Sequence, residues 1–181
     1  MAVKLVKPIN HKKVVKITNQ DFEAKMRELR VNSDIAVAVS GGPDSLALMH
    51  LSNRYALNNN INLTVLSIDH GIRAESSKEI VWLKKVAKKN KINFYSTKLK
   101  KKINSSNTLS KARTLRYEAL SKYCNKKKIK FLLTAHHLDD EIENFLMRLI
   151  RGSGVKGLSS LKAKSRYKNT KLILVRPLLE Y

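Results

Sequence analysis

Cysteine, acidic residues and long apolar runs are all scarce in this sequence. The single cysteine, Cys124, excludes an intrachain disulfide and a metal site built from several thiolates, which is typical of a reduced compartment. No apolar run reaches the eighteen residues that a membrane-spanning helix needs, and residues 1–20 hold none long enough for a signal peptide. We therefore expect a cytoplasmic protein with no membrane partner.

The shortage of acidic residues leaves a strongly basic chain. Thirty-seven Lys and Arg stand against fourteen Asp and Glu, so the formal net charge is +23. A surplus of this size favours a polyanion as partner, and nucleic acid is the first expectation. The alternative is compositional drift, because Lys, Asn and Ile are abundant together, as A/T-rich codons would produce.

Strand-like and helix-like segments alternate along the chain. Short runs rich in β-branched or aromatic residues predict strands at 35–39, 63–68, 92–95, 130–134 and 172–175. Helices are expected at 21–29, 44–57, 77–90, 109–127 and 139–151. This order predicts an α/β fold, a Rossmann-like three-layer structure with a parallel sheet of about five strands. Ligands of such folds bind beyond the carboxyl ends of the strands.

The chain is expected to divide into an arm and one domain. Residues 1–20 carry five Lys and no acid, so we expect a basic N-terminal arm there. Residues 21–181 hold all the predicted strands and helices and are expected to form a single folded domain.

The first predicted strand runs into a glycine-containing loop, Ser40-Gly41-Gly42-Pro43-Asp44-Ser45. The glycines permit close approach of a ligand to the backbone and the proline suits the first turn of a helix, so the N–H groups there can bind phosphate. It is not a Walker A loop, because the Gly-Lys-Ser/Thr ending is missing. The negative charge of Asp44 would repel phosphate unless a divalent cation lay between them. Mg²⁺ is the indicated cation, because it prefers hard oxygen ligands such as carboxylate and phosphate. The alternative is that Asp44 only caps the helix.

Acidic and imidazole side chains also follow two other predicted strands. They are Asp69 and His70 after the second strand, and His136, His137, Asp139 and Asp140 after the fourth. With Asp44, these places hold four of the six aspartates of the chain, which suits a metal site. Zinc is conceivable, since His136 and Asp140 would share a helical face with residue 143 or 144. Mg²⁺ with phosphate is favoured, because adjacent histidines on one element point apart.

Arginine is concentrated in the same stretches. Arg113 and Arg116 lie on one face of the helix expected at 109–127, and Arg148 and Arg151 close the helix expected at 139–151. The planar guanidinium can bind phosphate through two parallel hydrogen bonds, so these positions predict phosphate or nucleotide contacts. A solvated helix face is the alternative.

Together these segments resemble the PP-loop ATP pyrophosphatases. In that group the Ser-Gly-Gly-Pro-Asp-Ser loop binds the pyrophosphate of ATP, and the enzyme adenylates an oxygen of its substrate. The stretches "DHGIRAES", "ARTLRY", "AHHLDDEIENFLMRLIRGSGVKGL" and "RPLL" stand in the order typical of the tRNA(Ile)-lysidine synthases, and the resemblance spans residues 35–179. The implied fold is that of the adenine nucleotide alpha-hydrolases, and residues 21–181 would be the catalytic domain.

The resemblance implies a reaction. Free L-lysine would be ligated, at the expense of ATP, to C2 of the wobble cytidine of tRNA(Ile) with a CAU anticodon, through an adenylated cytidine, to form lysidine. The basic arm and the lysines between 84 and 102 could then bind the tRNA backbone, with a solvated lysine face as the alternative. A homodimer is possible and stays open.

The resemblance also implies roles for individual residues. Catalysis would fall to Asp44, Arg113, His136, Asp139 and Asp140, and the three aspartates among them would hold Mg²⁺. ATP would contact Ser40, Gly41, Gly42, Pro43, Asp44, Ser45, Asp69 and His70. Arg73, Arg116, Arg148 and Arg151 would bind tRNA or phosphate.

Two other functions stay open. Another PP-loop enzyme, such as a tRNA thiolase or an amide-forming synthetase, would share the loop, although thiolation generally calls for several cysteines and this chain has one. The other is a truncated RNA-binding remnant without ATP chemistry, since members of the resembled family continue past "RPLL" into tRNA-binding segments that we expect to be missing here.

Overall fold

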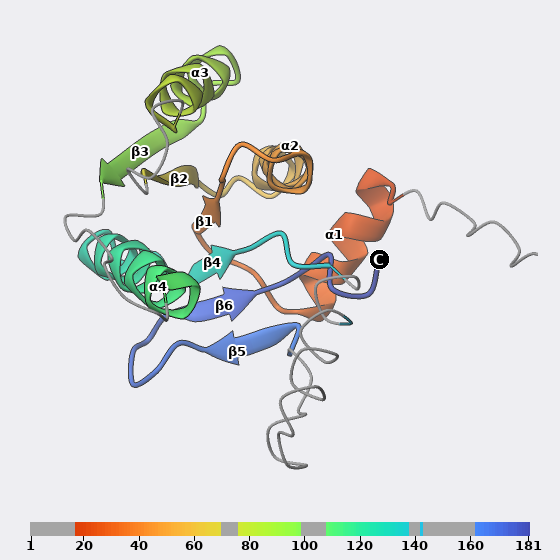
Figure 1. Cartoon of the computed structure of the whole chain (residues 1–181). Coiled ribbons are helices and arrows are strands. Elements are labelled where there is room, and N and C mark those ends of the chain that lie inside the picture. The colour runs from red at the N-terminus through yellow and green to blue at the C-terminus, as the bar shows by residue number, and fades with distance from the viewer. Residues whose placement is uncertain (1–16, 70–75, 99–107, 138–141, 143–161) are drawn as a thin grey trace, which may run out of the picture.

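Strands and helices alternate through most of the chain, as Figure 1 shows for the computed structural model, which describes residues 17–69, 76–98, 108–137, 142 and 162–181. The elements are α1 (Asn19–Glu28), β1 (Ile35–Ala38), α2 (Pro43–Asn58), β2 (Leu63–Asp69), α3 (Ser76–Lys89), β3 (Asn93–Lys98), α4 (Thr108–Lys126), β4 (Phe131–Leu133), β5 (Lys164–Arg166) and β6 (Ile173–Val175). Four of the five predicted helices are thereby confirmed. The fifth, expected at 139–151, lies almost wholly outside the described residues.

The strands form one six-stranded sheet in the order β3-β2-β1-β4-β6-β5. The five predicted strands are all present and parallel, which confirms the α/β fold class. β5 was not predicted, and it pairs antiparallel with β6 at one edge. The chain passes from β1 to β2 on one side of β1 and later returns to place β4 on the other side. The order therefore reverses between β1 and β4, where open α/β sheets bind their ligands.

Helices cover both faces of the sheet, so the expected three layers are present. Val37 faces the core that the sheet shares with α1, α2 and α3, and Leu83 of α3 packs into it. Its neighbour Ala36 faces the opposite core, which contains Leu120 and Cys124 of α4. Cys124 is fully buried in α4.

The two N-termini at α1 and α2 are built differently. Thr18 and Asp21 form a capping box on α1, because each side chain accepts a hydrogen bond from the other's backbone N–H. α1 therefore begins inside the last residues of the expected arm; residues 1–16 lie outside the described residues. α2 begins with Gly42 at the cap and Pro43 in the first turn, and no side chain caps it within the described residues. Its first N–H groups thus lack both a carbonyl of the helix and a capping side chain.

None of the helices in the described parts of the chain is long and apolar enough to cross a membrane.

Candidate functional site

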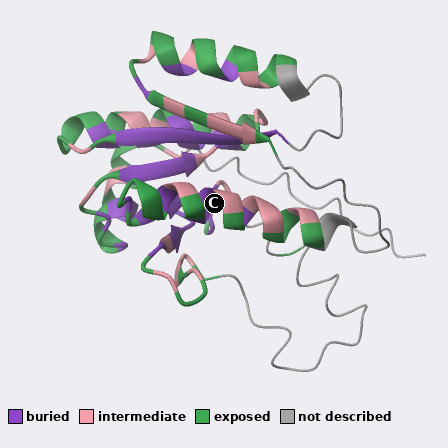
Figure 2. Cartoon of the chain, turned by 90° about the vertical axis from the view of Figure 1, so that its left-hand side faces the viewer, coloured by how far each residue is buried: buried purple, intermediate pink, exposed green. Residues whose placement is uncertain are grey.

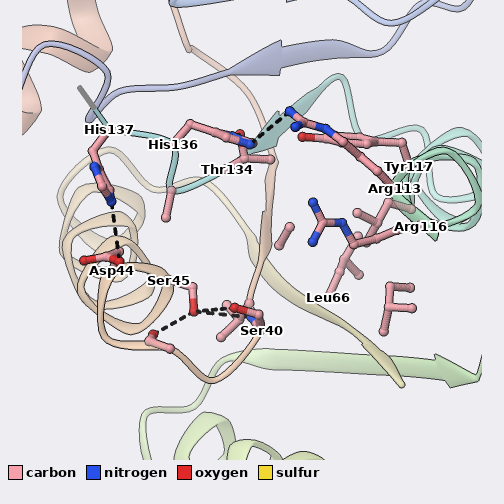
Figure 3. Close-up of a pocket in the computed structure, with 16 residues that line it drawn as sticks. Ser40, Asp44, Ser45, Leu66, Arg113, Arg116, Tyr117, Thr134, His136 and His137 are labelled. Atoms are coloured by element: carbon pink, nitrogen blue, oxygen red, sulfur yellow. Dashed lines mark hydrogen bonds and ion pairs between the residues drawn. The ribbon is translucent and has the colours of Figure 1, made fainter. Parts of the chain in front are cut away.

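The loop between β1 and α2 has an internal scaffold of serine hydroxyls. Ser45 Oγ donates to the Gly42 carbonyl at 2.8 Å, and the Ser40 N–H donates to Ser45 Oγ at 3.3 Å (Figure 3). Ser40 Oγ lies 3.4 Å from the same oxygen. One buried hydroxyl therefore ties the two ends of the loop together and leaves the backbone between them in a set conformation.

Gly41 is required by the conformation of this loop. Its φ of +94° is one that residues with a Cβ rarely adopt. A Cβ built there would come no closer than 4.0 Å to a described atom, the nearest being Glu79 Oε2. Crowding within the described chain does not explain the glycine, so its functions are the turn itself and open access of a ligand to the backbone. Asp44 and Ser45, in the first turn of α2, line the same pocket as Ser40 and Gly42 of the loop.

The opposite wall comes from α4 and from the segment after β4. Arg113 and Arg116 flank the ring of Tyr117, with their guanidinium carbons 6.0 and 5.5 Å from its centroid. His136 lies between Arg113 and Thr134 (Figure 3), with Nε2 3.3 Å from Arg113 Nη2 and Nδ1 2.9 Å from Thr134 Oγ1. The sequence prediction that Arg113, Arg116 and Tyr117 share a helical face is confirmed.

The contact with Arg113 favours one tautomer of the neutral His136 ring. Arginine has no acceptor, so Nε2 of His136 accepts from Arg113. The proton of the neutral ring then lies on Nδ1, which donates to the Thr134 hydroxyl. The imidazole is thereby held with a basic nitrogen beside a guanidinium that can bind phosphate.

Loop and opposite wall enclose one pocket at the reversal of the sheet. Its volume is about 370 Å³, which lies in the range of small-molecule sites. Apolar side chains form its floor and polar ones its two walls. The lining residues include Ala38, Leu66, Ile68 and Leu120 on the floor, with Ser40, Gly42, Asp44, Ser45, Arg113, Arg116, Tyr117, Thr134, His136 and His137 around it. An apolar floor between two groups of phosphate-binding donors suits a nucleotide.

Asp44 is the acidic group of the pocket. It lies in the first turn of α2 with its side chain 58% exposed, and Oδ2 is 3.7 Å from Nε2 of His137. Mg²⁺ in phosphate-transfer sites is commonly held by one or two carboxylates together with the phosphates of the substrate. An accessible carboxylate at the mouth of a phosphate loop fits that requirement. Among the residues that the structure describes there is no cluster of three or more metal-binding side chains, and the zinc alternative, which needs Asp140 and residue 143 or 144, lies outside those residues.

Asp69 is not among the residues that line the pocket. It ends β2, is almost fully buried, and its carboxylate lies 3.7 Å from Nζ of Lys98 at the end of β3. Six other predicted site residues lie outside the described residues: His70, Arg73, Asp139, Asp140, Arg148 and Arg151. Their assignments stay predictions.

Two polar groups at the site were not singled out from the sequence. Thr134 orients His136, and only its position at the end of a strand could have indicated it. Arg176, in the stretch "RPLL", is buried and donates to the carbonyl of Lys162 at 2.7 Å. Its Nε–H donates no hydrogen bond to any described residue. Burial lowers the pKa of the Arg176 guanidinium, Tyr117 opposes this, and the charge of Arg113 lowers the pKa further. Arg176 thus adds a third positive charge beside Tyr117.

The family of the chain follows from its sequence as a whole. A sequence profile of the PP-loop domain matches residues 10–181. The chain belongs to the PP-loop family. Membership implies that ATP binds. The loop at residues 40–45 is the stretch that resembles the PP-loop in sequence, and we refer to it by that name.

Two curated relatives are similar to most of the chain. The chain is 48% identical over 146 residues to a tRNA(Ile)-lysidine synthase of Rickettsia bellii, in a match that covers 81% of this chain and 33% of the relative. A tRNA(Ile)-lysidine synthase of Wolbachia pipientis is 42% identical, with 83% of this chain and 35% of the relative covered. The chain thus spans about a third of the length of these relatives.

Solved PP-loop structures support the fold. The chain is similar to the U34-tRNA thiolase NcsA from Methanococcus maripaludis, described with its [4Fe-4S] cluster, with a TM-score of 0.72 and 25% identity over 89% of this chain and 59% of that chain. It is also similar in fold to an FMN adenylyltransferase from Candida glabrata, with a TM-score of 0.54 and 14% identity. Iron–sulfur clusters are held mainly by cysteine thiolates. This chain has one cysteine, and burial raises the pKa of that thiol to about 12, so it does not fit a cluster ligand.

Proposed function

We propose that the chain carries the ATP-dependent step of lysidine formation, in which lysine is joined to C2 of the wobble cytidine of tRNA(Ile) with a CAU anticodon. The observation that carries the proposal is the pairing of a PP-loop with an arginine–histidine wall across a nucleotide-sized pocket. The relatives named tRNA(Ile)-lysidine synthase support this choice among PP-loop reactions, and the single buried cysteine disfavours thiolation.

The PP-loop binds the β- and γ-phosphates of ATP in this proposal. Backbone N–H groups at Gly41, Gly42 and the first turn of α2 donate to the phosphate oxygens, and the helix dipole favours their negative charge. Asp44, together with Asp139 or Asp140, would hold Mg²⁺, which would neutralise the phosphate charge. The adenosine lies toward the apolar floor beside Leu66 and Ile68.

The first chemical step forms the adenylated cytidine. The C2 oxygen of cytidine attacks the α-phosphorus of ATP, the bond to the bridging oxygen of the β-phosphate breaks, and pyrophosphate leaves. Negative charge develops on the α-phosphate oxygens, across the pocket from the loop. Arg113 and Arg116 are the described cations placed to stabilise it, and a preorganised donor of this kind typically contributes about 10²–10³ in rate.

The second step consumes the adenylate. The lysine amine attacks C2, the bond from C2 to the oxygen of AMP breaks, and the nitrogen gives up a proton. Nε2 of His136 can take up that proton once Arg113 turns from the imidazole to a phosphate oxygen, because its lone pair is then free. Thr134 orients the ring through its hydrogen bond to Nδ1.

The decisive experiment is nucleoside mass spectrometry. Unmodified tRNA(Ile) with a CAU anticodon is incubated with the chain, ATP, Mg²⁺ and lysine, and the digested nucleosides are compared with a reaction of the Asp44→Ala variant. We expect a lysine adduct on cytidine with the parent chain and none with the variant. Thiouridine formed with a sulfur donor in place of the adduct would overturn the proposal in favour of a thiolase. ATP-independent RNA binding without any product would favour the remnant.

A further inference from the structure

One side of the molecule combines exposed aromatic rings with lysines and has no part in the pocket. It is formed by α3, by β3 at the edge of the sheet and by the second half of α4; Figure 2 views the molecule from this side. We call it the basic–aromatic face and define it by Lys78, Trp82, Lys85 and Lys89 of α3, Tyr95 of β3, and Tyr123 and Lys126 of α4.

The α3 part of this face is a stripe centred on Trp82. Lys78, Lys85 and Lys89 stand four residues before, three after and seven after the tryptophan, so all four side chains share one side of the helix. Trp82 is 48% exposed, although Leu83 beside it is fully buried in the core. The ring therefore lies in solvent among three ammonium groups.

An ordinary solvated helix face does not account for this stripe. Such faces usually alternate charges of opposite sign, which form favourable pairs at a spacing of four residues. Within the stripe Lys85 and Lys89 repel at that spacing, as Lys84 and Lys88 do on a neighbouring side of α3, and no ion pair with a described acidic residue relieves either pair. Glu79 is the one acidic residue of α3, and its carboxylate lies at the other end of the helix beside Gly41. A bound polyanion would remove the repulsion.

The β3 and α4 part of the face repeats the combination. Tyr95 and Tyr123 stack with their ring centroids 4.1 Å apart and 27° between their planes, and Tyr95 is 39% exposed. Lys126 follows Tyr123 by three residues on α4. The segments 76–98 and 108–130 together hold fifteen Lys and Arg against two Glu, of which Glu118 is paired with Lys168. Lysines at the free edge of a sheet also discourage strand addition, so the edge favours a charged rather than a β-pairing partner.

We propose that the basic–aromatic face binds the RNA substrate, with the lysines on backbone phosphates and Trp82 stacked on an unpaired base. This inference rests on the proposed function for the identity of the RNA. Interleaved lysines and exposed rings are the chemistry by which proteins hold single-stranded or looped RNA. The face begins close to the PP-loop, because the carboxylate of Glu79 in the first turn of α3 is the nearest described group to a Cβ built at Gly41, at 4.0 Å.

Trp82 provides a direct test, since it is the one tryptophan of the chain. Its emission is recorded while tRNA(Ile) is added to the full chain, and ATP binding is measured separately by calorimetry. We expect tRNA to quench the emission, with a binding constant that weakens steeply as salt is raised. Quenching by tRNA with no lysine adduct in the mass-spectrometric assay would support the face and reject the proposed reaction.

Variants distinguish RNA binding at the basic–aromatic face from a general attraction of RNA to the net positive charge of the chain. Lys85→Gln/Lys89→Gln is expected to weaken tRNA binding about tenfold near physiological salt and to lower the slope of log K against log salt by about two. The matched control, Arg166→Gln/Lys171→Gln, removes the same charge at the opposite edge of the sheet and should change binding by less than about twofold. Trp82→Ala should lose about tenfold in affinity and Trp82→Phe much less, because a phenyl ring still stacks. ATP binding should be unchanged in all four.

Two results would overturn the inference. One is equal loss of tRNA affinity in the two double variants, which would mean that only net charge matters. The other is an unquenched Trp82 together with a dimer in sedimentation that Trp82→Ala converts to a monomer, because the face would then be a protein interface. Lysine adduct formed by the parent chain in either case would show that the proposed reaction survives the failure of this surface.

Discussion

Substitution of Asp44 should lower the rate of the reaction strongly and change the stability of the fold only slightly. Asp44→Asn removes the carboxylate that we assign to Mg²⁺, so pyrophosphate release should fall by at least about 100-fold. The side chain is largely exposed and contributes to folding mainly through the dipole of α2, so the free energy of unfolding should fall by less than about 1 kcal/mol. Pyrophosphate release and urea unfolding measure the two effects.

A matched control for this variant is Asp34→Asn. Asp34 is also a solvent-accessible aspartate. It directly precedes β1, and its carboxylate accepts hydrogen bonds from Asn62, which directly precedes β2, away from the pocket. It should keep its rate within about twofold, as surface changes outside a site usually do. Turnover by Asp44→Asn equal to that of the parent would remove Asp44 from the reaction.

Cys124 should make stability depend on alkaline pH. Burial raises the pKa of its thiol from 9.0 to about 12, so the folded chain holds this proton more tightly than the unfolded chain. The resulting stability is fully present below about pH 9 and is lost as the pH rises toward 12. Between about pH 7 and pH 10 the parent should lose roughly 1–1.5 kcal/mol more unfolding free energy than Cys124→Ala. Urea titrations at the two pH values test this, and parallel losses in both proteins would contradict it.

At the scale of elements, a substitution at the start of α2 should make the fold more stable and at the same time weaken the binding of ATP. Gly42 has an ordinary φ of −70° and room for a Cβ, which would lie 3.8 Å from Ser40 Oγ. Gly42→Ser can therefore place a hydroxyl on the N–H groups that phosphate uses, because serine is a preferred cap. The variant should be more stable by a few tenths of a kcal/mol and should bind ATP at least about tenfold more weakly.

Gly41→Ala is the informative comparison for that change. It also adds one side-chain carbon to the PP-loop, but at a φ of +94°, so it should be less stable by about 1 kcal/mol or more. Thermal unfolding and calorimetry with ATP separate the variants. Unchanged ATP affinity in Gly42→Ser would mean that the N–H groups of α2 do not bind the phosphates.

The elements also differ in how well the sequence predicts them. Parallel strands buried on both faces have continuous apolar runs, so β1, β2 and β4 could be located within a residue or two. β5 has the sequence Lys-Ser-Arg, without any apolar signal, and exists because its backbone pairs with β6. Lys164 within it donates to the carbonyl of Leu29 and lies over the Phe131 ring, contacts that only the folded chain creates. Whether such an edge segment becomes a strand depends on the neighbouring strand with which it pairs, and the local sequence does not encode that neighbour.

At the scale of the whole molecule, the sequence indicated the part of the pocket that lies at the carboxyl ends of neighbouring parallel strands, and it did not indicate the remainder. Residues at the carboxyl ends of β1 and β4 meet in one pocket because neighbouring parallel strands end at the same edge. Asp69 follows the same rule along the chain, yet it is turned to Lys98 and does not line the pocket. The buried Arg176 beside Tyr117 was not predicted either, since nothing local marks an arginine for burial.

The net charge of +23 should make the stability of the whole chain depend on salt. Like charges repel across the surface of the folded state, and salt screens this repulsion over a Debye length of about 10 Å at 0.1 M. Raising NaCl from about 0.05 to 0.5 M should therefore increase the Tm by about 2–4 °C, equivalent to about 1 kcal/mol. Sulfate at equal ionic strength should add a further increase, because it can also occupy the N–H groups of the PP-loop. Gly42→Ser should keep the increase due to NaCl and lose the extra increase due to sulfate. A Tm that is flat in NaCl would mean that the positive charges are already too far apart, or too well paired, to destabilise the fold.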